Sequence, residues 1–153
     1  MSRRTVLAAC AAMTASLALA GCLGSGSSDG KPELKVSGAY MPEPVDAEMA
    51  GGFLTVSNSG PAADKLTSVT SSLSSDITIH ETKNQKMQRA TSFDVPANGT
   101  LDLERGGSHI MFMGLKEKPK PGQKVPVELH FEKTGTVKVE LPVKERTYNP
   151  KHH

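Results

Sequence analysis

Two histidines and two methionines have the side chains and the spacing of a soft metal site. They form the pattern His-x6-Met-x21-His-x-Met at His80, Met87, His109 and Met111. Thioether sulfur is a soft, neutral ligand, and together with neutral imidazole it favours Cu(I) over the harder divalent ions. Zinc is disfavoured, because methionine is a poor zinc ligand and no cysteine completes a tetrahedron. The pattern therefore predicts a Cu(I) site. Spacing alone leaves open the alternative that these are four surface residues that do not come together.

The segments that carry these residues read as β-strands, in which side chains alternate between two faces. In HIMFMGL, at 109–115, alternation buries the isoleucine and the phenylalanine and turns His109, Met111 and Met113 outward. Residues two apart on a strand are roughly 6.6 to 6.8 Å apart at Cα, so His109 and Met111 can converge on one ion. In DITIHET, at 76–82, His80 faces away from the isoleucines, and the turn TKNQK lets a hairpin bring Met87 to the same end.

From residue 33 onward the whole chain has period two, interrupted by turn residues. The expected strands are 33–41, 52–58, 65–71, 76–82, 86–93, 100–104, 109–114, 124–132 and 136–143. They predict an all-β fold, an antiparallel β-sandwich of immunoglobulin or cupredoxin type. Pro126 predicts an edge or a bulge in its strand, and His130 is expected to be outward and solvated.

The N-terminus has the features of an export signal that is removed. Residues 1–21 combine a basic start with an apolar run of small residues, followed by Cys22 in the sequence LAGC. This tetrapeptide resembles a bacterial lipobox, so Cys22 is expected to carry lipid and to anchor an extracytoplasmic protein to the membrane. The alternative is cleavage at an Ala-x-Ala-like site with an incidental thiol. The paired arginines leave Sec or Tat export open.

The expected organisation is a Gly/Ser-rich tether at 22–32, a β-domain at 33–148 and a mobile tail at 149–153. The tail histidines, His152 and His153, have the chemistry to catch Cu(II) weakly, but they are equally explained as incidental residues. Cys10 and Cys22, the two cysteines, both lie in the processed region. The mature domain therefore has no disulfide and no thiolate ligand, which disfavours a blue-copper centre.

Composition narrows the partners and the chemistry. Without Arg3 and Arg4 the 18 basic residues become 16, against 16 acidic ones, so nothing indicates nucleic acid as a partner. No nucleophile–base pair or paired carboxylates stand out, and the protein is not expected to be an enzyme. Among the other methionines, Met113 is expected to pack beneath His80, with shielding of the ion or substitution for a lost ligand as the alternatives. Met41 and Met49 are expected in packing or at a rim, with a methionine-lined copper path as the alternative.

The stretch from Ile79 to Val127 resembles the periplasmic copper chaperone family PCuAC. The resemblance rests on His80-Glu81, Met87, the turn PANGTLDLERGGS, His109-Ile110-Met111 and the following Met-Gly-Leu, and it extends over roughly residues 34 to 143. It implies that His80, Met87, His109 and Met111 bind Cu(I). The first gap is six residues where the family usually has about ten, which makes Met87 the least secure of the four ligands.

The resemblance also implies a function and partners. The protein is expected to hold Cu(I) and deliver it towards cytochrome c oxidase assembly, with a Sco-type copper protein or the oxidase copper-site subunit as partner. Two alternatives stay open: a copper-buffering or resistance lipoprotein without a dedicated acceptor, and a metal-free scaffold domain of the cell envelope.

Overall fold

The computed structural model describes residues 30–150 of the 153-residue chain. The expected signal peptide, Cys22, most of the tether, and the tail histidines His152 and His153 lie outside the described residues. The described part contains the strands β1 (Leu34–Pro42), β2 (Met49–Asn58), β3 (Asp64–Ser71), β4 (Asp76–Lys83), β5 (Lys86–Ala90), β6 (Phe93–Val95), β7 (Thr100–Leu103), β8 (His109–Met113), β9 (Lys124–Phe131) and β10 (Gly135–Lys144). Residues 30–150 contain no helical segment with the length and hydropathy of a membrane span.

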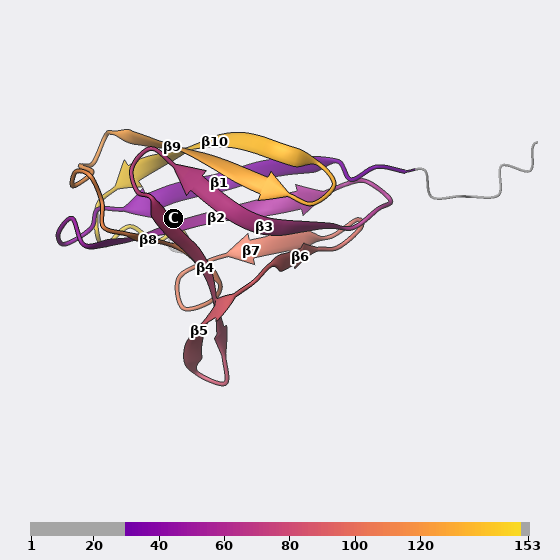
Figure 1. Ribbon diagram of the computed structural model, residues 1–153, viewed down its shortest axis with the longest axis horizontal. Coiled ribbons are helices and arrows are strands. Elements are labelled where there is room, and N and C mark those ends of the chain that lie inside the picture. Colours follow the sequence, from indigo (N-terminus) through magenta and orange to yellow (C-terminus); the bar gives the residue numbers. More distant parts are fainter. Residues whose placement is uncertain (1–29, 151–153) are drawn as a thin grey trace, which may run out of the picture.

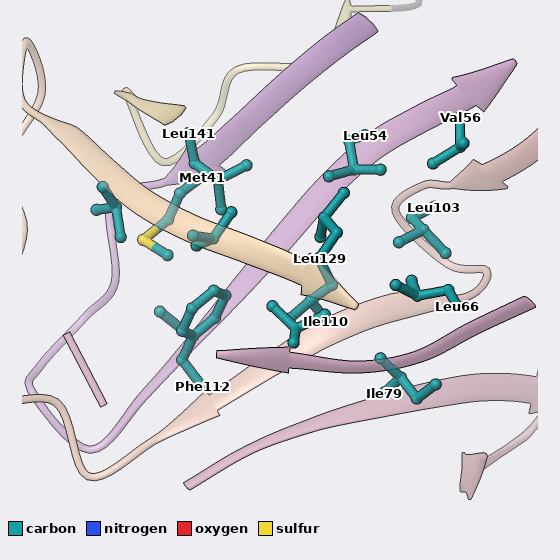
Figure 2. Close-up of a cluster of buried hydrophobic side chains, with 14 of the residues drawn as sticks. Met41, Leu54, Val56, Leu66, Ile79, Leu103, Ile110, Phe112, Leu129 and Leu141 are labelled. Atoms are coloured by element: carbon teal, nitrogen blue, oxygen red, sulfur yellow. The ribbon is translucent and has the colours of Figure 1, made fainter. Parts of the chain in front are cut away.

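The strands form one hydrogen-bonded path in the order β5-β4-β8-β2-β1-β10-β9-β3-β6, and β7 pairs with β2 (Figure 1). The pairing of β1 with β10 is parallel, and the other strand pairings are antiparallel. Buried side chains from both halves of the path, among them Ile110 of β8 and Leu129 of β9, form one core cluster (Figure 2). The prediction of an all-β, antiparallel sandwich is confirmed.

Side-chain alternation correctly identified the core face of β8. Ile110 and Phe112 are fully buried, whereas His109 and Met111 are only partly buried. The same is true of β9, whose apolar residues are buried while His130 points outward. His130 is not simply solvated, because its ring nitrogens lie 2.7 Å from the Thr70 hydroxyl and 3.1 Å from that of Thr136.

One expected strand is in fact two. The segment 86–93 breaks at Thr91 and Ser92 into β5 and β6, which lie at opposite ends of the hydrogen-bonded path. The chain crosses here from one half of the sheet to the other. Neither glycine nor proline marks the crossing, so the strongest turn signals are absent from this segment.

The expectation of an edge at Pro126 holds locally, because the β3 ladder ends at Val127, whereas the alternative of a bulge there does not hold. Strand β9 lies between β3 and β10, and its irregular register is opposite Leu66 to Ser68 rather than at the proline. The Pro126 carbonyl accepts a hydrogen bond from the Ser71 hydroxyl, at 2.6 Å. The nitrogen of Pro126 points to the same side as its carbonyl, towards β3. The β3 ladder, however, already ends at the Ser71–Val127 pair. The missing N–H therefore removes no bond from that ladder.

A five-residue loop at 104–108 separates β7 from β8, which pair with successive halves of β2. The loop closes on itself through a 2.9 Å hydrogen bond from the Glu104 N–H to the Ser108 carbonyl. Gly106 has φ of 79°, a left-handed conformation that glycine adopts without steric cost. The loop brings the chain back to β2 with His109 as the first residue of β8.

A two-residue turn joins β4 to β5. Asn84 and Gln85 have φ of 51° and 62°, so both central residues are left-handed, as a type I′ hairpin requires. This hairpin projects from the body of the sandwich (Figure 1). The prediction that a short turn joins the strands of His80 and Met87 is confirmed, and it accommodates the shortened gap between these residues.

Replacing Gln85 with glycine should stabilise this hairpin by up to about 1 kcal/mol, because a left-handed residue with a Cβ is strained by about that amount. We expect slower amide hydrogen exchange along β5. The matched control is Gln88→Gly within β5, which should speed exchange because glycine weakens a strand interior. Faster exchange in Gln85→Gly would contradict the assigned turn type.

Candidate metal centre

The outer faces of β2, β4 and β8 arrange the chemically active side chains in three rows across the strands. Between β4 and β8, the opposed pairs are His80 with His109, Thr78 with Met111 and Asp76 with Met113. Strand β2 adds Gly51 opposite Met111 and Met49 opposite Met113. Because alternate residues share a face, all these side chains lie on the side of the sheet away from the core. We call this surface the ligand face.

His80 and His109 lie in contact at one end of the ligand face. Their rings stack with centroids 5.6 Å apart and planes 14° from parallel. The Phe53 ring lies on the other side of His109, with centroids 6.3 Å apart. Two residues separated by 29 positions in the sequence thus become direct neighbours, because β4 and β8 pair in this register.

The backbone of the 104–108 loop fixes which nitrogen of His109 is available. Its Nδ1 lies 3.0 Å from the Gly107 carbonyl oxygen, which can only accept a hydrogen bond. Nδ1 therefore carries the proton in the neutral ring, and the lone pair is on Nε2. An imidazole held in one tautomer by a backbone carbonyl is typical of metal-binding histidines.

His80 has the complementary arrangement. Its Nε2 lies 2.8 Å from the Thr78 hydroxyl, and its Nδ1 is buried without a hydrogen-bond partner. A proton on Nε2 donates to Thr78 and leaves a lone pair, rather than an unsatisfied N–H, at the buried Nδ1. Burial lowers the pKa of His80, and the neighbouring His109 and Arg89 lower it further, so the ring is neutral at pH 7. Only the neutral ring can donate its lone pair to a metal.

The two methionines of the predicted set line a groove beside His109. This groove has a volume of about 500 Å³ and is lined by His109, Met111 and Met87, together with Phe53 and Arg105. Met87 is 57% exposed and lies opposite Thr82, one alternate position from His80 on β4. The structure thus brings His109, Met111 and Met87 to one groove and places His80 against His109, outside the groove lining.

The site also contains residues that sequence reasoning missed. Thr78 contacts His80, Phe53 contacts His109, and Arg105 lines the groove while donating a 2.7 Å hydrogen bond to the Arg146 carbonyl. For Thr78 a signal was present, because it stands two residues before His80 and so shares its face. For Phe53 and Arg105 no local signal exists, since their roles depend on long-range pairing.

The remaining methionines have separate outcomes. Met41 is fully buried in the core, and Met49 is 50% exposed at the rim of the groove, in line with the packing and rim positions expected for them. The expectation that Met113 packs beneath His80 is wrong. The register places Met113 opposite Asp76, two rows from His80, and its side chain is 38% exposed.

The available donors suit a soft ion. Among residues 30–150, no group of three or more His, Cys, Asp or Glu side chains is arranged to hold a metal. The soft side-chain donors in the groove beside the His80–His109 pair are the thioethers of Met87 and Met111, which prefer Cu(I).

Replacing Thr78 with valine should weaken Cu(I) binding about tenfold or more, because partners that orient a metal-binding histidine typically contribute that much. Competition with a chromogenic Cu(I) chelator measures the effect, and ¹⁵N NMR of the apo-protein should show His80 losing its preference for a proton on Nε2. Thr78→Ser keeps the hydroxyl and should retain both properties. Wild-type affinity in Thr78→Val would contradict this role.

The fold and the ligand face define a β-domain of the PCuAC type. The structure is similar to the apo PCuAC domain from PmoF1, with a TM-score of 0.67 and 25% identity, covering 73% of this chain and 93% of that one. It is also similar to the solution structure of CuI-DR1885 from Deinococcus radiodurans, with a TM-score of 0.60 and 26% identity, covering 74% and 78% of the two chains. The resemblance to PCuAC proteins seen in the sequence is confirmed.

The family itself follows from sequence comparison. The family described as "Putative lipoprotein LpqE-like" matches residues 34–143, and the chain belongs to this LpqE-like family. A relative, "Putative lipoprotein Lxx21020" of Leifsonia xyli subsp. xyli (strain CTCB07), is 41% identical over 117 residues, which cover 73% of this chain and 70% of the relative.

Proposed function

We propose that the protein is an extracytoplasmic Cu(I) metallochaperone that binds its cargo through His80, Met87, His109 and Met111. The observation that carries this proposal is the stacked histidine pair, in which each ring keeps one nitrogen free of protein hydrogen bonds. Thioethers beside the pair supply the further ligands that a three- or four-coordinate Cu(I) ion needs. The DR1885 relative, described as a CuI form, supports this choice of cargo.

Membrane attachment is the second part of the proposal. The family and the Leifsonia relative are both described as lipoproteins, which supports lipidation at Cys22. A Gly/Ser-rich tether at 22–32 would then hold the β-domain close to the outer surface of the cell membrane.

Transfer would proceed by ligand exchange rather than by enzymatic chemistry. An acceptor thiolate attacks the bound Cu(I), a mixed-ligand complex forms, and the neutral thioethers leave first as the weaker donors. Met87 is the thioether most open to displacement, because it is 57% exposed on a strand at the end of the sheet. No electron moves, so the ion stays Cu(I) throughout.

The proposed route leads towards cytochrome c oxidase assembly, with a Sco-type protein or the oxidase copper-site subunit as partner. Resemblance to PCuAC proteins supports this route. A copper-buffering lipoprotein would use the same ligands but lack a dedicated acceptor, and a metal-free scaffold would use none of them.

The decisive experiment is a Cu(I) titration followed by transfer. The copper-loaded protein is mixed with the apo form of a Sco-type protein and of an oxidase copper-site domain, and copper is measured on each after separation. Tight binding with transfer is expected. Tight binding without transfer to either acceptor would leave the buffering function, and absence of binding would leave the scaffold.

A further inference from the structure

Two exposed methionines lie side by side beyond the proposed site. Met49 and Met113 are 50% and 38% exposed, and they are directly opposite each other on β2 and β8. Directly opposed residues of an antiparallel pair have Cβ atoms roughly 4.5 to 5.5 Å apart, so both thioethers can reach one ion. Neither residue belongs to the His-x6-Met-x21-His-x-Met pattern.

A carboxylate completes this row. Asp76 is exposed and lies opposite Met113 on the other side, so Met49, Met113 and Asp76 form one line across β2, β8 and β4. This provides two soft sulfur donors and one negative charge. Two thioethers select Cu(I), and one carboxylate balances its single positive charge.

The backbone holds this row in place. The hydroxyl of Ser74, which is buried, donates to the Met113 carbonyl and accepts a 3.0 Å hydrogen bond from the Asp76 N–H. On the other side, the Gly114 N–H donates to the Glu48 carbonyl at 2.8 Å. The ends of β4 and β8 and the start of β2 are thus fixed relative to one another.

From these contacts we infer that Met49, Met113 and Asp76 form a second, weaker Cu(I) site, the outer site. Met111 lies between it and His109, since Met113, Met111 and His109 share one face of β8. Consecutive positions on this face are roughly 6.6 to 6.8 Å apart. The outer site therefore lies where an arriving ion can be held and passed along the methionines to the histidine pair. Binding at the outer site stands alone, whereas inward passage rests on the proposed function.

Selective ¹³C-methyl labelling of methionine tests the outer site, with Ag(I) as an air-stable probe and Cu(I) under anaerobic conditions. We expect two equivalents to bind. The first should shift the methyl signals of Met87 and Met111, and the second those of Met49 and Met113. In Met49→Leu/Met113→Leu, which conserves side-chain volume, the second equivalent should be lost and the first retained. Asp76→Asn should weaken only the second equivalent.

Two further outcomes separate this inference from the proposed function. A His80→Asn/His109→Ala variant should lose the first equivalent and still shift the methyl signals of Met49 and Met113. Unshifted Met49 and Met113 signals at two equivalents, or a second equivalent retained in the double leucine variant, would overturn the outer site. If instead the histidine variant retained the first equivalent, the proposed function would fail and the outer site would stand.

Discussion

Replacing His109 with alanine should lower the affinity for Cu(I) by about a hundredfold or more, equivalent to roughly 3 kcal/mol of binding free energy. The variant loses an imidazole whose Nε2 lone pair is presented by the hydrogen bond between Nδ1 and the Gly107 carbonyl. It also loses the ring that stacks on His80. Competition with a chromogenic Cu(I) chelator measures the change in affinity.

His130 supplies the matched control, because it is also a histidine that points outward from a strand. It lies on β9 and its ring nitrogens are both engaged by threonine hydroxyls. His130→Ala should therefore bind Cu(I) as the wild type does. Equal loss in the two variants would mean that copper binds without a defined site, and no loss in His109→Ala would refute the ligand assignment.

Replacing Asp64 with asparagine should lower the free energy of unfolding by about 2 to 3 kcal/mol, the largest effect on stability that we expect from one polar substitution. Asp64 is 2% exposed and accepts hydrogen bonds from four donors. These are the backbone N–H groups of Lys65, Lys133 and Thr134, at 2.8 to 2.9 Å, and the Thr134 hydroxyl, at 2.5 Å. Asparagine offers one acceptor oxygen in place of two, so the partly buried donors at one of the two positions lose their acceptor.

Urea denaturation at pH 7 measures this loss, with Asp94→Asn as the control. Asp94 forms an ion pair with Lys65, in which Asp94 Oδ1 lies 3.9 Å from Lys65 Nζ. Both side chains are highly exposed. An ion pair of that kind contributes about 0 to 1 kcal/mol, so the control should stay close to wild type. Similar stabilities for the two variants would contradict the role assigned to Asp64.

The contribution of Asp64 also has a defined pH dependence. Burial alone would raise the pKa of Asp64, but the hydrogen bonds from Thr134, Lys133 and Lys65 outweigh it and hold the pKa below its ordinary value of 3.8. Stability from this group is therefore complete above that ordinary value and is lost as the pH falls through the lower, folded-state pKa. The difference between wild type and Asp64→Asn should shrink when denaturation is repeated at pH 3.

Periodicity in the sequence was sufficient to identify most of the strands and their core faces. Ile110 and Phe112 were assigned to the core because strict alternation in β8 puts them on one face and His109 with the two methionines on the other. The break between β5 and β6 was missed, because Thr91 and Ser92 resemble strand residues and only the tertiary path separates the two strands. Pro126 correctly indicated a local edge, but not that its strand lies inside the sheet, because that depends on where the neighbouring strand ends.

The candidate ligands were found from residue type, but their mutual positions required the strand order. The pairing of His80 with His109 follows from the register between β4 and β8, which no local pattern encodes. The same register places Met113 opposite Asp76 rather than beneath His80. Alternation alone predicts that Thr78 shares a face with His80. It does not predict that Met113 lies opposite Met49, because that depends on the pairing of β2 with β8.

Strand β5, described above as the end of the sheet, has a consequence for the kinetics of the protein. Within residues 30–150, β5 pairs only with β4, and four of its five residues are exposed, so it contributes nothing fully buried to the core. Such ribbons open locally at a small fraction of the free energy of global unfolding. Opening of β5 would lift Met87 from the groove while His80, His109 and the core stay in place. The time that the cargo stays bound and the resistance of the domain to denaturation are then separate properties. Gln85→Gly should lengthen the time that the cargo stays bound. Asp64→Asn should lower only the resistance to denaturation.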